Sequence, residues 1–246
     1  MLTFGNTYLN FGGAYLKEWY KEENPLNLPK YTIRVLYKDN TEPTEKAGTS
    51  IEQISTTPNI WDINGNPFGS WNSLLRNEKD LLSVLGGNSY DINSFLSMFE
   101  GCSSLSSVAN FNIKGKVNRI FTNCDSLTIV PNFNMNGVYS MVSMFQGCTS
   151  LTNIPKLNTI NVSSMQAAFF GCTNLKNIPD LDTSNLANSD FMFASCYNVS
   201  GGILDFYNKL NNQFVPPYSH SRTFWGCGKN SQTGSAELAQ IPSDWK

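Results

Sequence analysis

The chain has 246 residues, 40% of them hydrophobic, which allows one large domain or two small ones with a sizeable core. Charged residues make up only 15%, the formal net charge is −2, and lysine and arginine never form a run. This balance argues against nucleic acid and anionic lipid surfaces as partners. The first residues lack the pattern of a secretory signal, and no apolar stretch reaches membrane-spanning length, so we expect neither export by the usual route nor membrane insertion.

The N-terminal segment, residues 1–28, predicts a small β structure that serves for attachment. Residues 2–16 read as three very short strands broken by Gly5-Asn6 and Gly12-Gly13, and such a meander has little core of its own. Its aromatic rings must be buried on the same chain or on a neighbouring one, and we favour the neighbour, which implies a homo-oligomer. A trimer would suit a fibre. The candidate assembly contacts are Phe4, Tyr8, Phe11, Tyr15, Trp19 and Tyr20.

Residues 29–90 predict a small mixed α/β cap. Strands are expected at 31–37, 50–55 and 59–63, because β-branched and aromatic residues alternate there with polar ones. We expect one short helix carrying Leu74 and Leu75, and a second that begins at Asp80 and ends at Gly86-Gly87.

Residues 91–199 contain a sequence repeat of about 24 residues. A phenylalanine stands three residues before each cysteine, and an aliphatic residue stands three residues after the first five cysteines. A fixed period of this length is typical of a solenoid, in which each unit buries its apolar residues against the next. The cysteines are Cys102, Cys124, Cys148, Cys172, Cys196 and Cys227.

Each unit predicts a short helix followed by an extended segment. Apolar residues fall on one helical face before the cysteine, and a glycine or similar residue directly before it is typical of a helix end. Prolines at 131, 155 and 179 then keep the chain extended. We expect reduced, buried cysteines, because a constant repeat position is that of a small core residue. The polar column Asn112, Asn134, Asn158 and Asp182 is expected to bridge backbone groups between units.

Residues 200–246 predict a C-terminal cap. A helix is expected at 203–210, the repeat pattern returns once at 224–227, and residues 236–245 would close the far end.

The stretch from Met144 to Met165 resembles the BspA-like class of leucine-rich repeats, found in surface proteins of gut and oral bacteria. The tail, at 220–224 and 237–245, resembles virion components of phages that infect gut Bacteroidetes. The resemblance implies an α/β repeat fold, a short leucine-rich-repeat solenoid with small mixed caps. Departures are Lys114-Gly115-Lys116 where later units read Asn-Gly or Thr-Ser-Asn, and Asn230 where a leucine is expected.

A search for chemistry in the sequence finds no catalytic set, cofactor motif or metal site. The one histidine, His220, has serines beside it but no acid at a telling spacing, and the cysteines are never paired at zinc-ligand spacing. A surface remains as the functional feature. Its candidate residues are Tyr139, Lys156 and Lys176 in variable loops, and Trp61, Trp71 and Trp225 as rings that could stack on a sugar.

Two hypotheses follow. The first is a non-enzymatic phage virion protein, a head or tail fibre or decoration element, whose N-terminal segment docks on other virion proteins and whose repeats face a host-surface glycan or protein. The second is a bacterial surface adhesin or protein-interaction module, which the repeat family alone implies. An enzyme with unrecognised chemistry is kept as a remainder.

Overall fold

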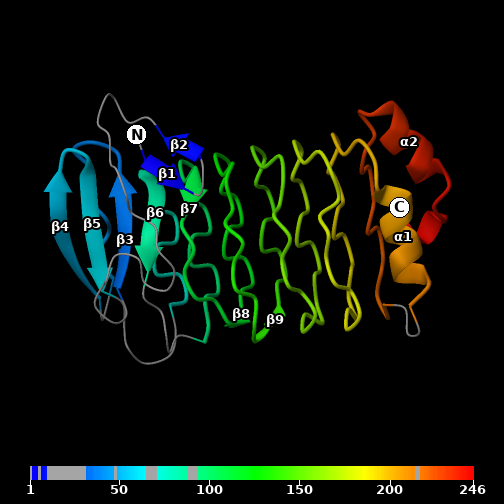
Figure 1. Ribbon diagram of the computed structural model, residues 1–246, viewed down its shortest axis with the longest axis horizontal. Coiled ribbons are helices and arrows are strands. Elements are labelled where there is room, and N and C mark those ends of the chain that lie inside the picture. The colour runs from blue at the N-terminus through cyan, green and yellow to red at the C-terminus, as the bar shows by residue number, and fades with distance from the viewer. Residues whose placement is uncertain are drawn as a thin grey trace.

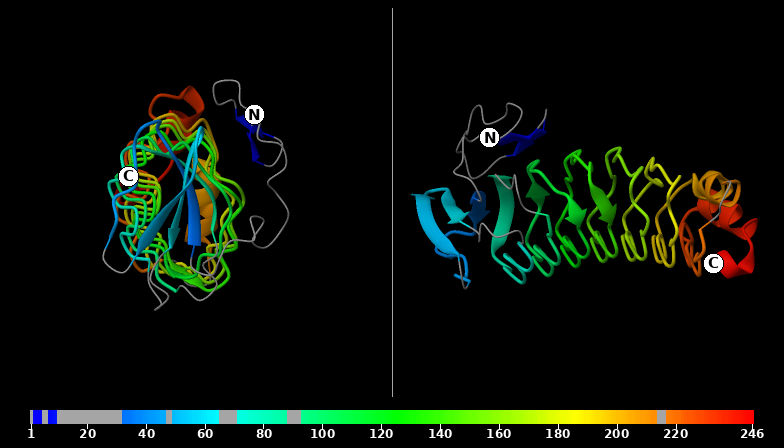
Figure 2. Two further views of the ribbon diagram at one scale, coloured as in Figure 1. Left: turned by 90° about the vertical axis from the view of Figure 1, so that its left-hand side faces the viewer. Right: turned by 90° about the horizontal axis from the view of Figure 1, so that it is seen from below.

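The computed structural model describes residues 2–4, 7–9, 32–46, 49–64, 71–87, 93–213 and 217–246. Its centre is a row of coils of the chain, stacked side by side between a β-sheet at one end and two helices at the other (Figure 1). Seen along the row, the coils superimpose into one closed outline (Figure 2). One buried apolar cluster runs through the row, from Ile33 in the sheet to Trp245 near the C-terminus.

The sheet has five strands in the order β4-β5-β3-β6-β7. Strand β3 pairs antiparallel with β5 and β6, and β6 pairs in parallel with β7. The three strands expected in the N-terminal cap, at 31–37, 50–55 and 59–63, are confirmed. The bounds are β3 Thr32–Tyr37, β4 Ser50–Thr56, β5 Asn59–Asn64, β6 Leu81–Gly87 and β7 Ser107–Val108.

The two helices expected in the N-terminal cap are wrong. Residues 81–87 form strand β6, which is buried between β3 and β7. A strand with neighbours on both edges and both faces covered carries a near-continuous apolar run, which sequence periodicity cannot tell from a helix. Residues 71–77 form tight turns, with positive φ at Ser73 (56°) and Asn77 (64°).

The helix expected in each repeat is also wrong, and tight turns take its place. In the coil that contains Cys148, the Cys148 N–H donates to the Phe145 carbonyl at 3.1 Å, three residues back. The backbone φ angle is 54° at Ser143 and 74° at Gly147, the fifth and first residues before the cysteine. A right-handed helix cannot contain such angles, so each coil turns twice instead of winding into a helix.

Hydrogen bonds join each coil to the next through alternate residues of this turn region. In the Cys148 coil, Ser143 N–H donates to Gln166 O and Phe145 N–H to Ala168 O, each at 2.8 Å. The pattern begins at Trp71, whose N–H donates to Ser94 O. It ends where Phe224 N–H donates to Trp245 O. The buried backbone groups of the row are therefore paired without a conventional sheet, an arrangement consistent with a repeat region.

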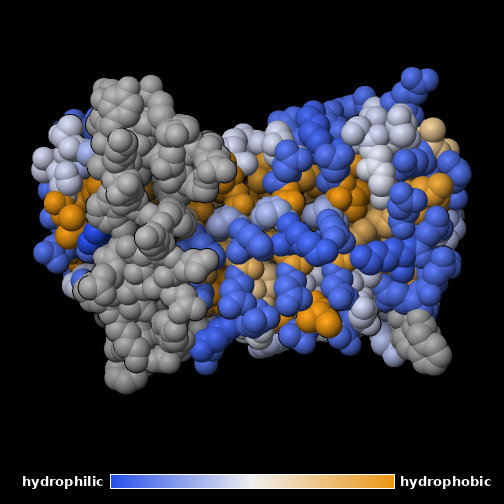
Figure 3. Space-filling model, viewed as in Figure 1, coloured by the Kyte–Doolittle hydropathy of each residue, from blue (hydrophilic) through white to orange (hydrophobic). Residues whose placement is uncertain are grey.

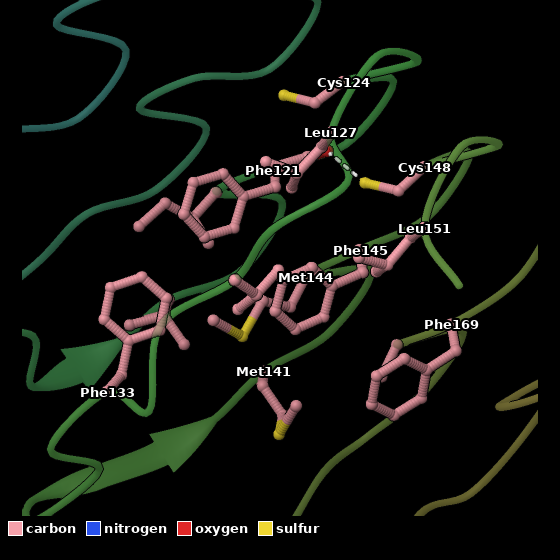
Figure 4. Close-up of a cluster of buried hydrophobic side chains, with 14 of the residues drawn as sticks. Phe121, Cys124, Leu127, Phe133, Met141, Met144, Phe145, Cys148, Leu151 and Phe169 are labelled. Carbon is pink, nitrogen blue, oxygen red and sulfur yellow. Dashed lines mark hydrogen bonds between the residues drawn. The ribbon is translucent and has the colours of Figure 1, made fainter. Parts of the chain in front are cut away.

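The repeat phenylalanines form a continuous stack inside the row (Figure 4). Phe121, Phe145 and Phe169 are fully buried, with ring centroids 5.6 and 5.7 Å apart and rings within 12° of parallel. The six cysteines are free and buried, as expected. The thiol of Cys148 donates to the Phe121 carbonyl of the preceding coil at 3.1 Å, the contact drawn in Figure 4. Aromatic stacking and thiol donation therefore recur at the spacing of the coils.

Three residues of the polar column, Asn134, Asn158 and Asp182, form turns within their own coils, where bridges to backbone groups of the next coil were expected. The side-chain oxygens of Asn134 and Asp182 accept from the backbone N–H groups of Asn136 and Ser184, two residues further along. These local turns reverse the chain within one coil, as such side chains commonly do. Across coils, the Asn158 amide donates to Asn136 at 3.3 Å.

Two helices close the other end of the row. Helix α1, Ile203–Asn211, confirms the expected helix and buries Ile203, Phe206 and Leu210. Helix α2 spans Gln232–Ala239, and a 3₁₀ turn spans Ser243–Trp245. The remaining strands pair as two short ladders. These are β1 Leu2–Phe4 with β2 Thr7–Leu9, antiparallel, and β8 Gly115–Lys116 with β9 Val138–Ser140, parallel. Among the described residues, no helix is long and apolar enough to cross a bilayer.

Candidate binding surface

The N-terminal aromatic residues fall mostly outside the described part of the chain. Phe4 and Tyr8 lie on the paired strands β1 and β2, where the backbone register sets Thr3 opposite Tyr8 and Phe4 opposite Thr7. The other four candidate assembly contacts lie outside the described residues; they are Phe11, Tyr15, Trp19 and Tyr20.

Two of the three candidate sugar-stacking tryptophans are core residues. Trp71 is 1% exposed and packs edge-on against Phe95. Trp61 is buried, and its indole N–H donates to the Asn59 side chain at 2.9 Å. Trp225 is 49% exposed, so it is the one of the three that can meet a ligand.

The three loop candidates lie on the surface, at separate positions. Tyr139 is 47% exposed, and Lys176 is exposed. Lys156 pairs with Asp180 at 2.8 Å, and this hydrogen bond and ion pair raise the pKa of Lys156 and lower that of Asp180. Because both side chains are in water, the pair adds little to stability.

His220 packs against the C-terminal cap and does not form a catalytic set with the adjacent serines. Its ring stacks on Trp245 at 4.1 Å, and its Nδ1 lies 4.0 Å from a carboxylate oxygen of Asp244. The Ser219 hydroxyl donates to Asp190 and not to the histidine. Within the described ranges, no group of three or more His, Cys, Asp or Glu residues could hold a metal ion.

The cysteine column is held in its neutral form. Burial raises the pKa of Cys102 and of Cys172 to about 12, and raises those of Cys148 and Cys196 well above the ordinary value. A nucleophilic cysteine needs a lowered pKa and exposure, and these thiols have neither.

Outward side chains change from coil to coil, whereas inward ones repeat. Figure 3 shows hydrophilic residues spread along one face of the row, with smaller apolar areas between them. In the Cys148 coil, the positions five and two residues before the cysteine and one after it are Ser143, which is buried, and the half-buried Gln146 and Thr149. This coil is therefore built with polar residues at the three positions.

At the C-terminal end of the row, the same positions carry aromatic residues. We call Phe170, Phe191, Tyr197 and Trp225 the C-terminal aromatic patch. Phe170 and Trp225 stand two residues before their cysteines, Phe191 five before, and Tyr197 one after. Hydrogen bonds place the three coils side by side, because Gly171 N–H donates to Ala194 O and Ser195 N–H to Trp225 O. Phe170, Phe191 and Tyr197 are half-buried and lie outside the core cluster.

Two cations lie over rings of this patch. The guanidinium carbon of Arg222 is 5.9 Å from the centroid of Phe191, and the ammonium nitrogen of Lys229 is 3.8 Å from that of Tyr197. Both cations are exposed. Such contacts hold a positive charge over a ring, and the side of the cation that faces away from the ring stays in water.

A ladder of amides runs beside the patch. The Asn198 amide donates to the Asn174 oxygen at 3.2 Å, and the Asn230 amide donates to the Asn198 oxygen at 3.1 Å. Sequence reasoning considered Trp225 but missed Phe170, Phe191 and Tyr197. Aligning the repeats on their cysteines would have found them, because aromatic residues replace serine, threonine and glutamine at outward positions.

Comparison with known proteins supports the repeat resemblance over part of the chain. Neither the search of curated proteins nor that of solved structures found a match. Residues 115–224, a little under half of the chain, match the family model described as "Mycoplasma protein of unknown function, DUF285", which is of the BspA-like leucine-rich-repeat type.

Proposed function

We propose that the chain is a non-enzymatic structural or attachment protein, in which a leucine-rich-repeat solenoid presents a fixed surface to another macromolecule. One observation carries the proposal. Inward positions repeat phenylalanine and cysteine, whereas outward positions differ between coils. A stacked scaffold of this kind holds its outward side chains at set spacings, which is how repeat proteins build extended binding faces.

A phage particle is the location that we propose first, as a head or tail fibre or decoration element. The resemblance of the tail at 220–224 and 237–245 to virion components supports it. The second candidate is the bacterial cell surface, where the chain would act as an adhesin. The resemblance of residues 144–165 to a repeat class found in bacterial surface proteins supports this location.

Fractionation of a culture that makes the protein tests both locations. Particles, cell envelope and soluble contents would be separated, and the chain would be quantified in each fraction by mass spectrometry. Enrichment in particles supports the virion role, and enrichment in the envelope supports the adhesin role. A chain found mainly with the soluble contents would contradict both.

The proposal includes self-association through residues 1–28, with a trimer as the form that suits a fibre. Six aromatic side chains within residues 2–20 give this segment more apolar area than so short a stretch can bury on its own. Deletion of residues 1–28 should convert an oligomer into a folded monomer, as measured by light scattering and thermal melting. An unchanged mass together with a lower melting temperature would show that the segment packs on its own chain.

A further inference from the structure

The backbone hydrogen bonds that join the coils do not require the C-terminal aromatic patch. In the Cys148 coil, Gln146 and Ser143 occupy the positions that Trp225 and Phe191 occupy in later coils, and the hydrogen bonds between coils are the same. Aromatic residues are therefore not required by the backbone at these positions. Phe191 and Tyr197 also meet cations of the next coil, whereas Trp225 leaves about half of its surface in water.

Phe191 is placed against its own backbone preference. Its φ is 55°, in the left-handed region, which costs a bulky residue more than it costs serine or glycine. The matching residue of the Cys148 coil is Ser143, at φ 54°. Long side chains stand at this position in other coils too, at Arg119 (58°) and Arg222 (53°), so the angle belongs to the repeat and the side chain varies.

A small, buried residue lies in the middle of the patch. Ala194 lies in the outward column between Phe170 and Trp225, yet it is fully buried. Its larger neighbours therefore cover it. A flat, partly apolar ring can lie face to face on exposed aromatic side chains.

The polar groups around the rings match a hydroxyl-rich anion. Each amide of the ladder at Asn174, Asn198 and Asn230 has donor and acceptor capacity beyond its bonds within the ladder, as hydroxyl groups require. Arg222 and Lys229 add positive charge beside the rings. A carboxylate or sulfate group would complement both.

We propose that the C-terminal aromatic patch, with Arg222, Lys229 and the adjacent asparagine ladder, binds an acidic glycan. Sugar rings stack on Phe170, Phe191 and Trp225, hydroxyl groups bond to the asparagine amides, and acidic groups pair with the two cations. The inference rests on the proposed attachment function and names its ligand class. It predicts that the rest of the row serves as a spacer for this site.

The test uses the full chain with three acidic polysaccharides, polygalacturonate, hyaluronate and heparin, and with neutral dextran. Retardation in native gels that contain each polysaccharide measures binding. Tryptophan fluorescence that changes in the wild type but not in a Trp225→Gln variant reports on the site, because Trp225 is exposed while the other described tryptophans, Trp61, Trp71 and Trp245, are buried. Wild-type protein should bind at least one acidic polysaccharide and should bind dextran at least tenfold more weakly. Binding should weaken in 1 M salt, where screening acts within about 3 Å.

The test variant combines Phe170→Gln, Phe191→Ser and Trp225→Gln, which are the residues of the Cys148 coil at these positions. It should keep its melting temperature and lose at least tenfold in affinity. Tyr139→Ser removes a similarly exposed ring from another part of the row and should bind as the wild type does. A second variant, Arg222→Gln with Lys229→Gln, should lose binding and salt dependence together.

Three results would overturn the inference: no binding to any acidic polysaccharide, equal binding by the triple variant, or equally tight binding to dextran. Culture fractionation separates this failure from failure of the proposed function. If the triple variant still enters particles or envelope and no polysaccharide binds, attachment stands and the glycan is wrong. If the wild-type chain stays with the soluble contents, the attachment function itself fails.

Discussion

The side-chain amide oxygen of Asn123 occupies the space that a β-carbon on Gly147 would need. The two residues hold the same position, directly before the cysteine, in adjacent coils. Gly147 also has a φ of 74°. The spacing of neighbouring coils therefore depends on a residue without a side chain at this point.

Gly147→Ala should destabilise the protein by about 1 to 3 kcal/mol, since it combines left-handed strain with overpacking. Urea unfolding would measure the loss. Gly137→Ala is the matched control, because Gly137 has a similar φ of 81° but only the Lys114 β-carbon near it, at 3.7 Å. Gly147→Ala should lose more stability than Gly137→Ala, because only Gly147 is crowded by Asn123. Adding Asn123→Gly to Gly147→Ala should restore this difference. Equal losses for the two alanine variants would show that Asn123 does not crowd Gly147.

Stability should fall as the pH rises above about 9. Burial raises the pKa of Cys172 to about 12 in the folded chain, whereas an unfolded cysteine titrates near about 8.5. The neutral thiol therefore contributes its full share of the free energy of unfolding below the pKa of the unfolded chain. As the pH rises from that pKa to the pKa of the folded chain, the free energy of unfolding falls by about 1.4 kcal/mol per pH unit for each such cysteine. Urea unfolding at pH 7.5, 9 and 10 would measure it.

The control for this pH dependence is Cys172→Ala, which should be less stable at pH 7.5 but should lose less on going to pH 10. The same burial predicts that thiol reagents label no cysteine in the folded protein and all six after unfolding in urea. Rapid labelling without denaturant would contradict the buried column, and a flat stability profile would contradict the raised pKa values.

Phe145→Ala should cost about 3 to 5 kcal/mol, because it opens a cavity within the stack between Phe121 and Phe169. Thermal and urea unfolding would measure the loss. Tyr139→Ala, at an exposed ring, should change stability by less than about 0.5 kcal/mol. A melting curve for Phe145→Ala that matches the wild type would remove the phenylalanine stack as a source of stability.

The apolar period predicted the inside of the row but not its backbone. Phe145 and Cys148 are buried as their spacing indicated, because burial follows from which positions recur. The turns were missed, since apolar residues at a helix-like spacing also fit two tight turns with left-handed residues at Ser143 and Gly147. Of these two residues, only Gly147 indicates a positive φ in the sequence, because serine rarely adopts one.

Long-range pairing explains the other differences. The apolar run in β6 reads as a helix until β3 and β7 are known to flank it. Side chains of the polar column accept hydrogen bonds from backbone N–H groups two residues further along the same coil, as Asp182 does from Ser184. The aromatic patch escaped notice because Phe170, Phe191 and Trp225 belong to three coils that only the fold places side by side.

The C-terminal cap depends on one carboxylate. Oε2 of Glu237 in α2 accepts from the backbone N–H groups of Ile203 at 2.7 Å and Leu204 at 3.3 Å, at the start of α1. Gly202, the residue that precedes α1, supplies no side chain for this purpose. A carboxylate here satisfies two otherwise unpaired donors and lies at the positive end of the helix dipole.

Glu237→Ala should therefore destabilise the protein by about 1 to 3 kcal/mol, and Glu237→Gln by less, because the amide oxygen can still accept but carries no charge. Hydrogen exchange should show that residues 203–211 lose protection first, since α1 covers the end of the phenylalanine stack through Phe206 and Phe193, whose ring centroids are 5.4 Å apart. Glu52→Gln, on an exposed position of β4, is the control and should have no such effect. The Glu237→Ala variant could instead unfold at the same urea concentration as the wild type, with unchanged hydrogen-exchange protection of residues 203–211. That result would show that the apolar face of α1 alone holds the helix and that the carboxylate is dispensable.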